Sequence, residues 1–260
     1  MKKIEDVKKI VVSLSGGLDS TTLLYLAVNT LGKDNVYALS FNYSQRHDVE
    51  LECAKATCKK LGVYHQIIDI GFLGEIVSGV SAMVKGKVKT PTFGEVNAAK
   101  EVKTYVPFRN AILSSITLAF AESVGADGVA LGVQFGDYEN NEAYYYWDCS
   151  KQFTETMQQL ADLNDKHKIS YVAPFVQLTK KDEIELGSKL GVDYSLTWTC
   201  YSNNITKSEV RYEEEPLGGK NPMTYDFWKP CQTCPSCVGR LEAFKALGLE
   251  DPQKGMWKRR

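Results

Sequence analysis

The sequence LSGGLDSTT, residues 14–22, follows the apolar run KIVVS at residues 9–13. This run is short and rich in β-branched residues, which is typical of a buried parallel strand. After the two glycines, apolar residues recur at helical spacing and predict a helix over Leu18–Leu31. LSGGLDSTT is therefore predicted to form a loop that joins the carboxyl end of a strand to the N-terminus of a helix.

A loop at this position can bind phosphate. Paired glycines let backbone N–H groups approach an anion closely, and the helix N-terminus adds the positive end of its dipole. Ser15 and Ser20 add hydroxyl donors, and the carboxylate of Asp19 suits either a magnesium ion or a helix N-cap. The spacing matches neither G-x-x-x-x-G-K-[ST] nor G-x-G-x-x-G. An ordinary strand-to-helix turn capped by Asp19 or Ser20 is the alternative.

Strand-like and helix-like segments alternate along the chain after this loop. Short apolar runs predict strands at residues 36–41, 64–70, 128–133 and 171–173. Helical periodicity predicts helices at residues 46–61, 112–126, 150–165 and 178–190. The alternation predicts an α/β protein with a Rossmann-like parallel sheet, whose ligands bind at the carboxyl ends of the strands. Residues 72–103 are predicted to form a mobile loop with one short helix.

Two cationic residues outside the loop are candidates for binding phosphate. Arg109 ends the sequence TYVPFR ahead of a helix, and its planar guanidinium can bind phosphate or carboxylate with two hydrogen bonds. Lys180 lies near the start of the helix opened by Thr179 and can reach a phosphate at the top of the sheet. The alternatives are purely structural: Arg109 would form a surface salt bridge, and Lys180 would be a solvated charge on its helix. The aromatic residues within 134–153 suit stacking on a flat heterocycle, an interface or a covered sheet edge.

The cysteines predict a metal site. Of the seven cysteines, three form the pattern C-x-x-C-x-x-C at Cys231, Cys234 and Cys237, and Cys200 lies upstream as a fourth donor. Four thiolates satisfy tetrahedral zinc, and an iron–sulfur cluster is the alternative. Crowded cysteines suit a reducing compartment better than a disulfide framework, so a cytoplasmic location is expected. Cys53 and Cys58 are predicted to pack as small residues on a helix.

Length and charge narrow the class of protein. The chain has 260 residues, 43% hydrophobic content and a net charge of −1. This length suits one large domain with a small appendage, which we place at residues 1–195 and 196–260. The near-neutral charge does not call for nucleic acid or a membrane as a direct partner. The sequence lacks an apolar run long enough to span a membrane, and its start does not read as a signal peptide.

Several segments together resemble one enzyme family. S-G-G-x-D-S after the first strand is similar to the signature of the PP-loop ATP pyrophosphatases, which cleave ATP between the α- and β-phosphates. In chain order, LSGGLDSTT, YSQRH, TYVPFRN, TWTCY and CQTCPSCVGRLEAFKALGLEDP together resemble the QueC family of these enzymes. The resemblance extends from Ile10 to Pro252. The combination of the loop with the distal cysteines is more specific than either motif.

The resemblance implies a fold, a reaction and a pathway. The fold would be a PP-loop ATPase domain with a small zinc-bound C-terminal region. The reaction would convert 7-carboxy-7-deazaguanine and ammonia into 7-cyano-7-deazaguanine at the expense of ATP, in queuosine-type biosynthesis. The carboxylate would be adenylated, ammonia would give the amide, and adenylation of the amide would lead to the nitrile. A homodimer is expected because it is common among relatives.

The resemblance also implies roles for individual residues. ATP and magnesium would be bound by the loop residues Leu14, Ser15, Gly16, Gly17, Leu18, Asp19, Ser20, Thr21 and Thr22. The expected catalytic residues are Asp19, Ser20, Arg109 and Lys180, of which the last two neutralise charge on the phosphates. The substrate is expected near Arg46, Asn110 and Asp148. Zinc would be bound by Cys200, Cys231, Cys234 and Cys237.

The chain departs from the family pattern at four places. Phe108 replaces a small residue, Trp147 replaces a proline beside extra residues at 137–147, and Gln232 replaces a glycine. The link between Cys200 and Cys231, residues 201–230, is longer than usual. These departures leave room for a variant that stops at 7-amido-7-deazaguanine, or one that transfers the activated base to another amine. Another PP-loop amidating ligase and a non-enzymatic zinc module are further alternatives.

Overall fold

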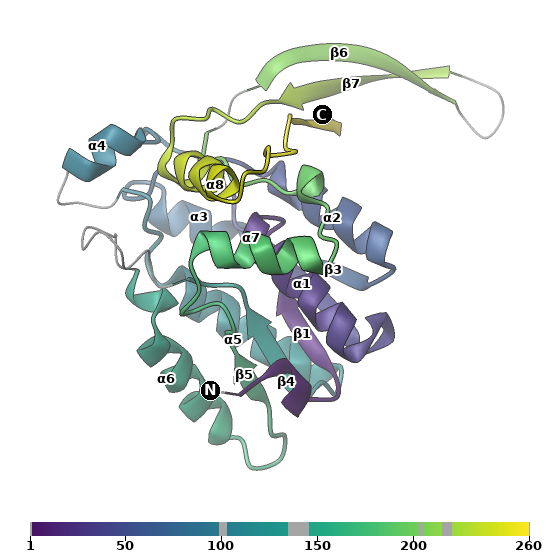
Figure 1. The fold of residues 1–260 in the computed structure, drawn as a ribbon, viewed down its shortest axis with the longest axis vertical. Coiled ribbons are helices and arrows are strands. Elements are labelled where there is room, and N and C mark those ends of the chain that lie inside the picture. The colour runs from purple at the N-terminus through teal and green to yellow at the C-terminus, as the bar shows by residue number, and fades with distance from the viewer. Residues whose placement is uncertain (1, 99–102, 135–145, 203–204, 215–219, 260) are drawn as a thin grey trace.

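The computed structural model describes residues 2–98, 103–134, 146–202, 205–214 and 220–259 (Figure 1). A five-stranded parallel sheet in the order β3-β2-β1-β4-β5 forms its centre. The strands are β1 (Ile10–Ser13), β2 (Val36–Asn42), β3 (Tyr64–Asp69), β4 (Gly128–Leu131) and β5 (Ser170–Val172). In the register, Ile10 of β1 lies opposite Val36 on one side and Gly128 on the other. The predicted α/β class with a parallel sheet is confirmed.

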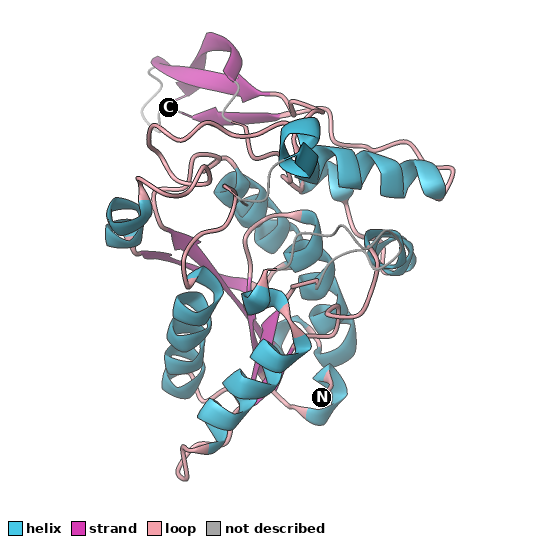
Figure 2. Ribbon diagram, turned by 90° about the vertical axis from the view of Figure 1, so that its left-hand side faces the viewer, coloured by secondary structure: helices cyan, strands magenta, loops and turns pink. Residues whose placement is uncertain are grey.

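Helices cover both faces of this sheet (Figure 2). Along β1, Ile10 and Val12 point to one core and Val11 to the other, as the period of a strand requires. The first core contains side chains of α1 (Leu18–Leu31), α2 (Glu50–Leu61) and the partly buried Leu186 of α7 (Lys180–Lys189). The second contains side chains of α3 (Gly71–Val77), α5 (Arg109–Ser123) and α6 (Lys151–Asp162). The domain is thus a three-layer α/β/α structure.

The order of the strands creates a crevice above β1 and β4. The chain leaves β1 toward β2 on one side and returns on the other side as β4. Neighbouring strands whose connections run in opposite directions leave a gap at their carboxyl ends, where α/β proteins bind ligands. Gly132, just after β4, lies against the first turn of α1, since a Cβ there would stand 3.1 Å from the Cα of Ser20. The loop 14–22 and the end of β4 therefore meet at this crevice.

The start of one helix and the content of one loop differ from the prediction. The helix predicted from residue 46 begins at Glu50, because the Arg46 N–H donates to the Met83 carbonyl and Gln45 forms a bridge with Val84. The segment predicted as a mobile loop with one short helix contains two helices in its described part, α3 and α4 (Phe93–Ala98). Its residues 81–84 are buried. Pairing with residues distant in sequence, which local periodicity does not reveal, explains both differences.

The C-terminal residues form a second, antiparallel sheet that the sequence analysis missed. It consists of β6 (Ile205–Glu214), β7 (Lys220–Trp228) and β8 (Met256–Arg259), and it lies at the far end of the molecule (Figure 1). Lys258 of β8 forms an ion pair with Asp48 at 2.8 Å. Between β7 and β8, α8 (Pro235–Ala246) packs against α7 through Phe244 and Ile184. The predicted boundary at residues 195/196 falls inside the short helix η5 (Tyr194–Leu196) and stays a prediction.

Short 3-10 helices complete the described elements. They are η1 (Ile4–Asp6), η2 (Lys33–Asn35), η4 (Trp147–Cys149) and η5. Among the helices that the structure describes, not one combines the length and the hydropathy that crossing a membrane requires.

Candidate active site and metal centre

The loop after β1 is held open by its own serine side chains. The Ser20 hydroxyl accepts the Ser15 N–H at 3.1 Å and lies 2.9 Å from the Ser15 hydroxyl, which in turn accepts the Gly17 N–H at 3.1 Å. Gly17 is the N-cap of α1, and the helix has no side-chain cap. This corrects the alternative of an ordinary turn capped by Asp19 or Ser20. Free N–H groups in the first turn are suited to an anion.

Gly16 brings the loop into contact with two other segments. Its φ of 90° is rare for residues with a side chain, and a Cβ would lie 2.0 Å from the Glu50 carbonyl oxygen. Its own carbonyl accepts the backbone N–H of Trp198 at 2.9 Å. The first glycine of the loop, Gly16, is therefore required for packing, and it does not line the cavity above the loop.

Asp19, Lys180 and Glu183 form a compact charged cluster beside the loop. The Lys180 ammonium donates to the Asp19 carboxylate and, at 3.3 Å, to Glu183. Burial and the neighbouring Asp19 charge raise the pKa of Glu183 well above its ordinary value. Burial opposes the charged form of Asp19 too, but Lys180 and a hydrogen bond with Glu183 lower the pKa of Asp19. Burial and the neighbouring charge thus favour the protonated form of Glu183, whereas Lys180 favours the ionised form of Asp19.

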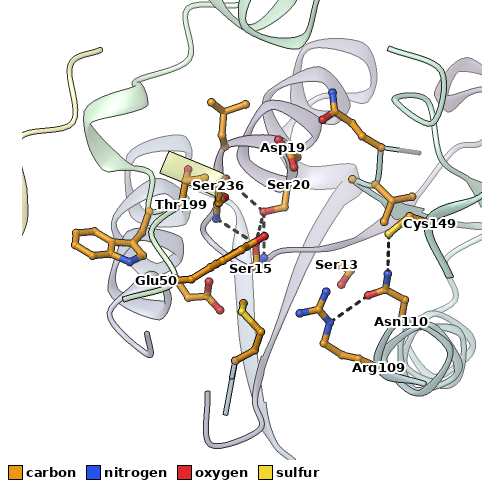
Figure 3. A pocket seen from close by; sticks show the side chains of 18 of the residues that line it. Ser13, Ser15, Asp19, Ser20, Glu50, Arg109, Asn110, Cys149, Thr199 and Ser236 are labelled. Carbon is orange, nitrogen blue, oxygen red and sulfur yellow. Dashed lines mark hydrogen bonds between the residues drawn. The ribbon is translucent and has the colours of Figure 1, made fainter. Parts of the chain in front are cut away.

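A cavity of about 490 Å³ lies over the loop at the carboxyl ends of β1, β2 and β4 (Figure 3). Its volume lies in the range usual for small-molecule sites. The loop contributes Leu14, Ser15, Gly17, Leu18, Asp19 and Ser20 to the wall. The other polar or charged side chains in the wall include His47, Glu50, Arg109, Asn110, Lys180, Thr199, Ser236 and Arg240. The structure thus brings most of the predicted loop residues together with Arg109, Asn110 and Lys180.

Arg109 is a cation in this wall without an acidic partner. Its Nε donates to the Asn110 side chain at 3.4 Å, and no carboxylate of the described residues forms an ion pair with it. The buried hydroxyl of Tyr43 lies close by: burial raises the pKa of Tyr43, while the charge of Arg109 opposes the rise. An uncompensated guanidinium in a cavity favours an anionic ligand, because burying a charge without a counter-charge is unfavourable.

The other expected residues take different places. Arg46 donates through Nη2 to the carbonyls of Gly86 at 3.0 Å and Val88 at 2.7 Å, and lies outside the cavity wall. Asp148 is buried outside the wall as well, and its carboxylate accepts the backbone N–H of Asn110 at 3.3 Å in the first turn of α5. Both side chains hold neighbouring backbone, and their contact with a substrate stays a prediction.

The two threonines of the loop also lie outside the cavity wall. Thr21 and Thr22 are fully buried under the loop. The Thr22 hydroxyl donates to the Leu18 carbonyl at 2.9 Å and lies 3.2 Å from the Tyr194 hydroxyl. Their contact with ATP likewise stays a prediction.

The departures near residues 108 and 147 form an aromatic group at the start of α5. Phe108 has a φ of 54°, a conformation that small residues such as glycine adopt most easily. Its ring lies 5.1 Å from that of Trp147, whose indole donates to the Tyr105 hydroxyl at 2.8 Å. Most of the predicted aromatic stretch, residues 135–145, lies outside the described residues. Cys149 lines the cavity, and burial raises the pKa of its thiol to about 12, so it is neutral.

The four predicted cysteines meet at one point. The sulfurs of Cys200, Cys231, Cys234 and Cys237 lie within 4.8 Å of one another. The Cys200 sulfur accepts the backbone N–H groups of Ser202 and Cys231, each at 3.3 Å. Tetrahedral zinc with Zn–S bonds of about 2.3 Å places its sulfurs about 3.8 Å apart, and such N–H donors stabilise thiolates. The group can therefore hold one metal ion. Cys53 and Cys58 are buried on α2, as predicted.

The cysteine group is joined to the phosphate loop by residues that the sequence analysis missed. The Trp198 indole donates to the Cys200 carbonyl at 2.9 Å, and its backbone N–H donates to Gly16. Arg240 is buried, forms a two-point ion pair with Asp251 at 2.8 Å and donates to Thr197 at 2.7 Å. In the sequence, the position of Arg240 three residues after Cys237 is the local signal for its role. The matching signal for Glu183, which the sequence analysis also missed, is its position three residues after Lys180.

Three features define the class of protein: the strand order, the uncapped loop after β1 and the cavity above it. This combination is typical of PP-loop α/β proteins, in which the loop binds the phosphates of a nucleotide. The charges in the cavity wall agree with this class, since Lys180 and Arg109 both provide cations there.

The chain belongs to the family described as queuosine biosynthesis protein QueC, whose family model matches residues 9–248. A 7-cyano-7-deazaguanine synthase from Caldicellulosiruptor saccharolyticus is 38% identical over 244 residues, which cover 94% of each chain. The synthase of Clostridium kluyveri is 38% identical over 254 residues, 95% of this chain and 98% of the relative. That of Cyanothece sp. is 40% identical over 253 residues, 94% of this chain and 98% of the relative.

Proposed function

We propose that this protein is an ATP-dependent carbon–nitrogen ligase that converts 7-carboxy-7-deazaguanine and ammonia into 7-cyano-7-deazaguanine. The names of its relatives support the substrate and product. The observation that carries the proposal is the single cavity in which the uncapped loop, Lys180 and the unpaired Arg109 meet. A nucleotide phosphate and an acid group can react there only if both are anchored next to each other.

The proposed reaction has two activations. The carboxylate of the base attacks the α-phosphate of ATP and releases pyrophosphate, which leaves an acyl adenylate. Ammonia then adds to the acyl carbon, and AMP leaves with the oxygen as the amide forms. The oxygen of the amide then attacks a second ATP and releases pyrophosphate, and loss of AMP together with both protons of the nitrogen gives the nitrile. Each activation replaces a poor leaving group, an oxide or hydroxide, with AMP.

The charged cluster beside the loop places the Lys180 ammonium where it can exchange its carboxylate partners for phosphate oxygens. Lys180 is held by Asp19 and Glu183 before ATP arrives, so its ammonium already points at the loop. Phosphate oxygens would then take over its hydrogen bonds, while Asp19 and Ser20 would hold magnesium, which neutralises charge on the leaving pyrophosphate. Arg109, which lines the same cavity, would stabilise charge on the phosphate under attack.

Zinc is the ion that the cysteine group suits best. The four sulfurs lie too close together to bond four different irons of a cluster, and they match the spacing around one tetrahedral ion. Zinc bound by four thiolates keeps no position for water or substrate. Its role here would be to hold residues 198–200 against the loop, because Trp198 connects Cys200 to Gly16.

The test is mass spectrometry of the products. Pure protein is incubated with 7-carboxy-7-deazaguanine, ammonium, magnesium and excess ATP, and the base and the nucleotide are followed together. The proposal expects nitrile with two AMP for each base. Amide that accumulates without becoming nitrile would assign the protein to the amide-forming alternative. An untouched acid without AMP would refute both.

A further inference from the structure

The cavity wall contains a buried carboxylate that the proposed activations do not use. Glu50 is only 7% exposed, and its side chain reaches the cavity from the first turn of α2 (Figure 3). Among the described residues, neither lysine nor arginine forms an ion pair with it; its partners are His47 and Gln45. A buried charge in this situation is unfavourable unless a ligand supplies hydrogen-bond donors.

The Glu50 carboxylate is held in a defined orientation. One oxygen lies 3.3 Å from His47 Nε2, and the other accepts from Gln45 Nε2 at 3.4 Å. Gln45 is fully buried and cannot turn, because its Oε1 accepts the Tyr43 N–H at 2.9 Å and its Nε2 also donates to the Phe41 carbonyl at 3.0 Å. Both bonds to Glu50 are long, so each carboxylate oxygen keeps lone pairs for a ligand.

We propose that Glu50 binds the donor edge of the guanine-type base. This edge consists of a ring N–H and an exocyclic amine side by side, a planar pair of donors that matches the two oxygens of a carboxylate. The proposal rests on the proposed function and names the residue that selects its base. Arg109 provides the complementary group, a cation that faces the same cavity and suits the carboxyl group of the substrate (Figure 3).

The same carboxylate discriminates against adenine. The corresponding edge of adenine has an amine beside a ring nitrogen with a lone pair, and that lone pair would face a carboxylate oxygen and repel it. Glu50 would thus keep the adenine of ATP out of the base site, which matters because both flat heterocycles enter one cavity.

The test compares two bases and three proteins by equilibrium binding without ATP. The bases are 7-carboxy-7-deazaguanine and its analogue without the exocyclic amine. The proteins are the wild type, Glu50→Gln and the matched control Glu52→Gln, a partly exposed glutamate of the same helix that pairs with Lys55. The wild type and Glu52→Gln should bind the guanine-type base at least about tenfold more tightly, since the analogue leaves an oxygen unpaired. Glu50→Gln should lose most of this preference.

Two results would overturn the proposal. They are equal affinity of the wild type for the two bases, and equal weakening of the binding of both bases by Glu50→Gln. If Glu50→Gln does not fold, two measurements still test the proposal. They are the affinities of the wild type for the two bases, and those of Glu50→Asp, which keeps the carboxylate on a side chain shorter by one methylene. A wild type that makes nitrile without discriminating the bases refutes only this inference; one that binds neither base refutes the proposed function as well.

Discussion

Trp198 donates its backbone N–H to the carbonyl oxygen of Gly16 at 2.9 Å, and its indole N–H to the carbonyl of Cys200 at the same distance. One fully buried residue, through its backbone and its side chain, thereby connects the cysteine group to the loop at residues 14–22. The C-terminal residues consequently help to shape the loop after β1, since Trp198 provides a contact to Gly16.

Removal of the metal should therefore weaken nucleotide binding as well as stability. Treatment with a chelator, or the substitution Cys234→Ser, should lower Tm and raise the Kd for ATP by about tenfold or more, because metal binding to the folded state adds to its stability. Calorimetric titration with ATP and thermal unfolding check this. Cys58→Ser, buried away from the group, is the control and should leave the Kd for ATP unchanged. An unchanged Kd in the metal-free protein would contradict the connection through Trp198.

Gly16→Ala should be strongly destabilising. The new methyl group would overlap the Glu50 carbonyl, where backbone cannot yield, and the positive φ adds strain. We expect a loss of about 3 kcal/mol or more in the free energy of unfolding. Gly94→Ala, with open space around the Cβ, is the control and should be neutral or slightly stabilising. Urea unfolding measures both, and equal effects would show that the close contact carries no energetic weight.

Lys180→Met should abolish most AMP formation without unfolding the protein. The ammonium faces the loop, and removal of one such charge commonly costs about 10²–10³ in kcat. Lys181→Met removes an exposed charge from the next position of the same helix and should change the rate less than about threefold. Initial rates of AMP release at saturating ATP provide the comparison. Similar rates for the two variants would remove Lys180 from the mechanism.

Glu183→Gln should make stability less dependent on pH. Because burial raises the pKa of Glu183 above the ordinary value of 4.5, the folded state binds the proton more tightly than the unfolded state does. The wild-type free energy of unfolding then falls as pH rises from about 4.5 toward the folded-state pKa, by up to about 1.4 kcal/mol per pH unit. Glutamine cannot ionise, so the variant avoids this loss.

The measurement is urea unfolding of both proteins at pH 5 and pH 7. The free energy of Glu183→Gln relative to the wild type should be higher at pH 7 than at pH 5. Asp19, whose pKa is lowered, titrates below this window and does not interfere. Glu185→Gln, on the exposed side of α7, is the control. A difference that does not change between the two pH values would mean that Glu183 is ionised in the folded protein.

The position of Glu50 in the cavity wall could not be predicted from the sequence. A helix was correctly expected here, but its start was placed at residue 46, where Glu50 would be one charge among several on a helix. Residues 45 and 46 pair with the segment at 83–84, so the helix begins only at Glu50. Its first turn therefore lies beside the loop. The partner segment is nearly forty residues away, so no local pattern carries this information.

The β6–β7 hairpin was missed for a related reason. Almost all residues of β6 are exposed, so the strand lacks the alternation of buried and exposed residues that marks a strand in sequence. Its pairing with β7, and that of β7 with the distant β8, becomes visible only in three dimensions.

By itself, the sequence determined the α/β class, the loop that joins the first strand to the first long helix, and the four cysteines, because these depend on residue types at short, fixed spacings. The tertiary structure alone decided which charges share the cavity. It brought Glu50, Arg109, Lys180 and Arg240 from four separate helices to one wall, and it turned Arg46 and Asp148 to backbone groups instead. The reason is physical: the free energy of a buried charge is set by the partners that surround it, and those come from segments distant along the chain.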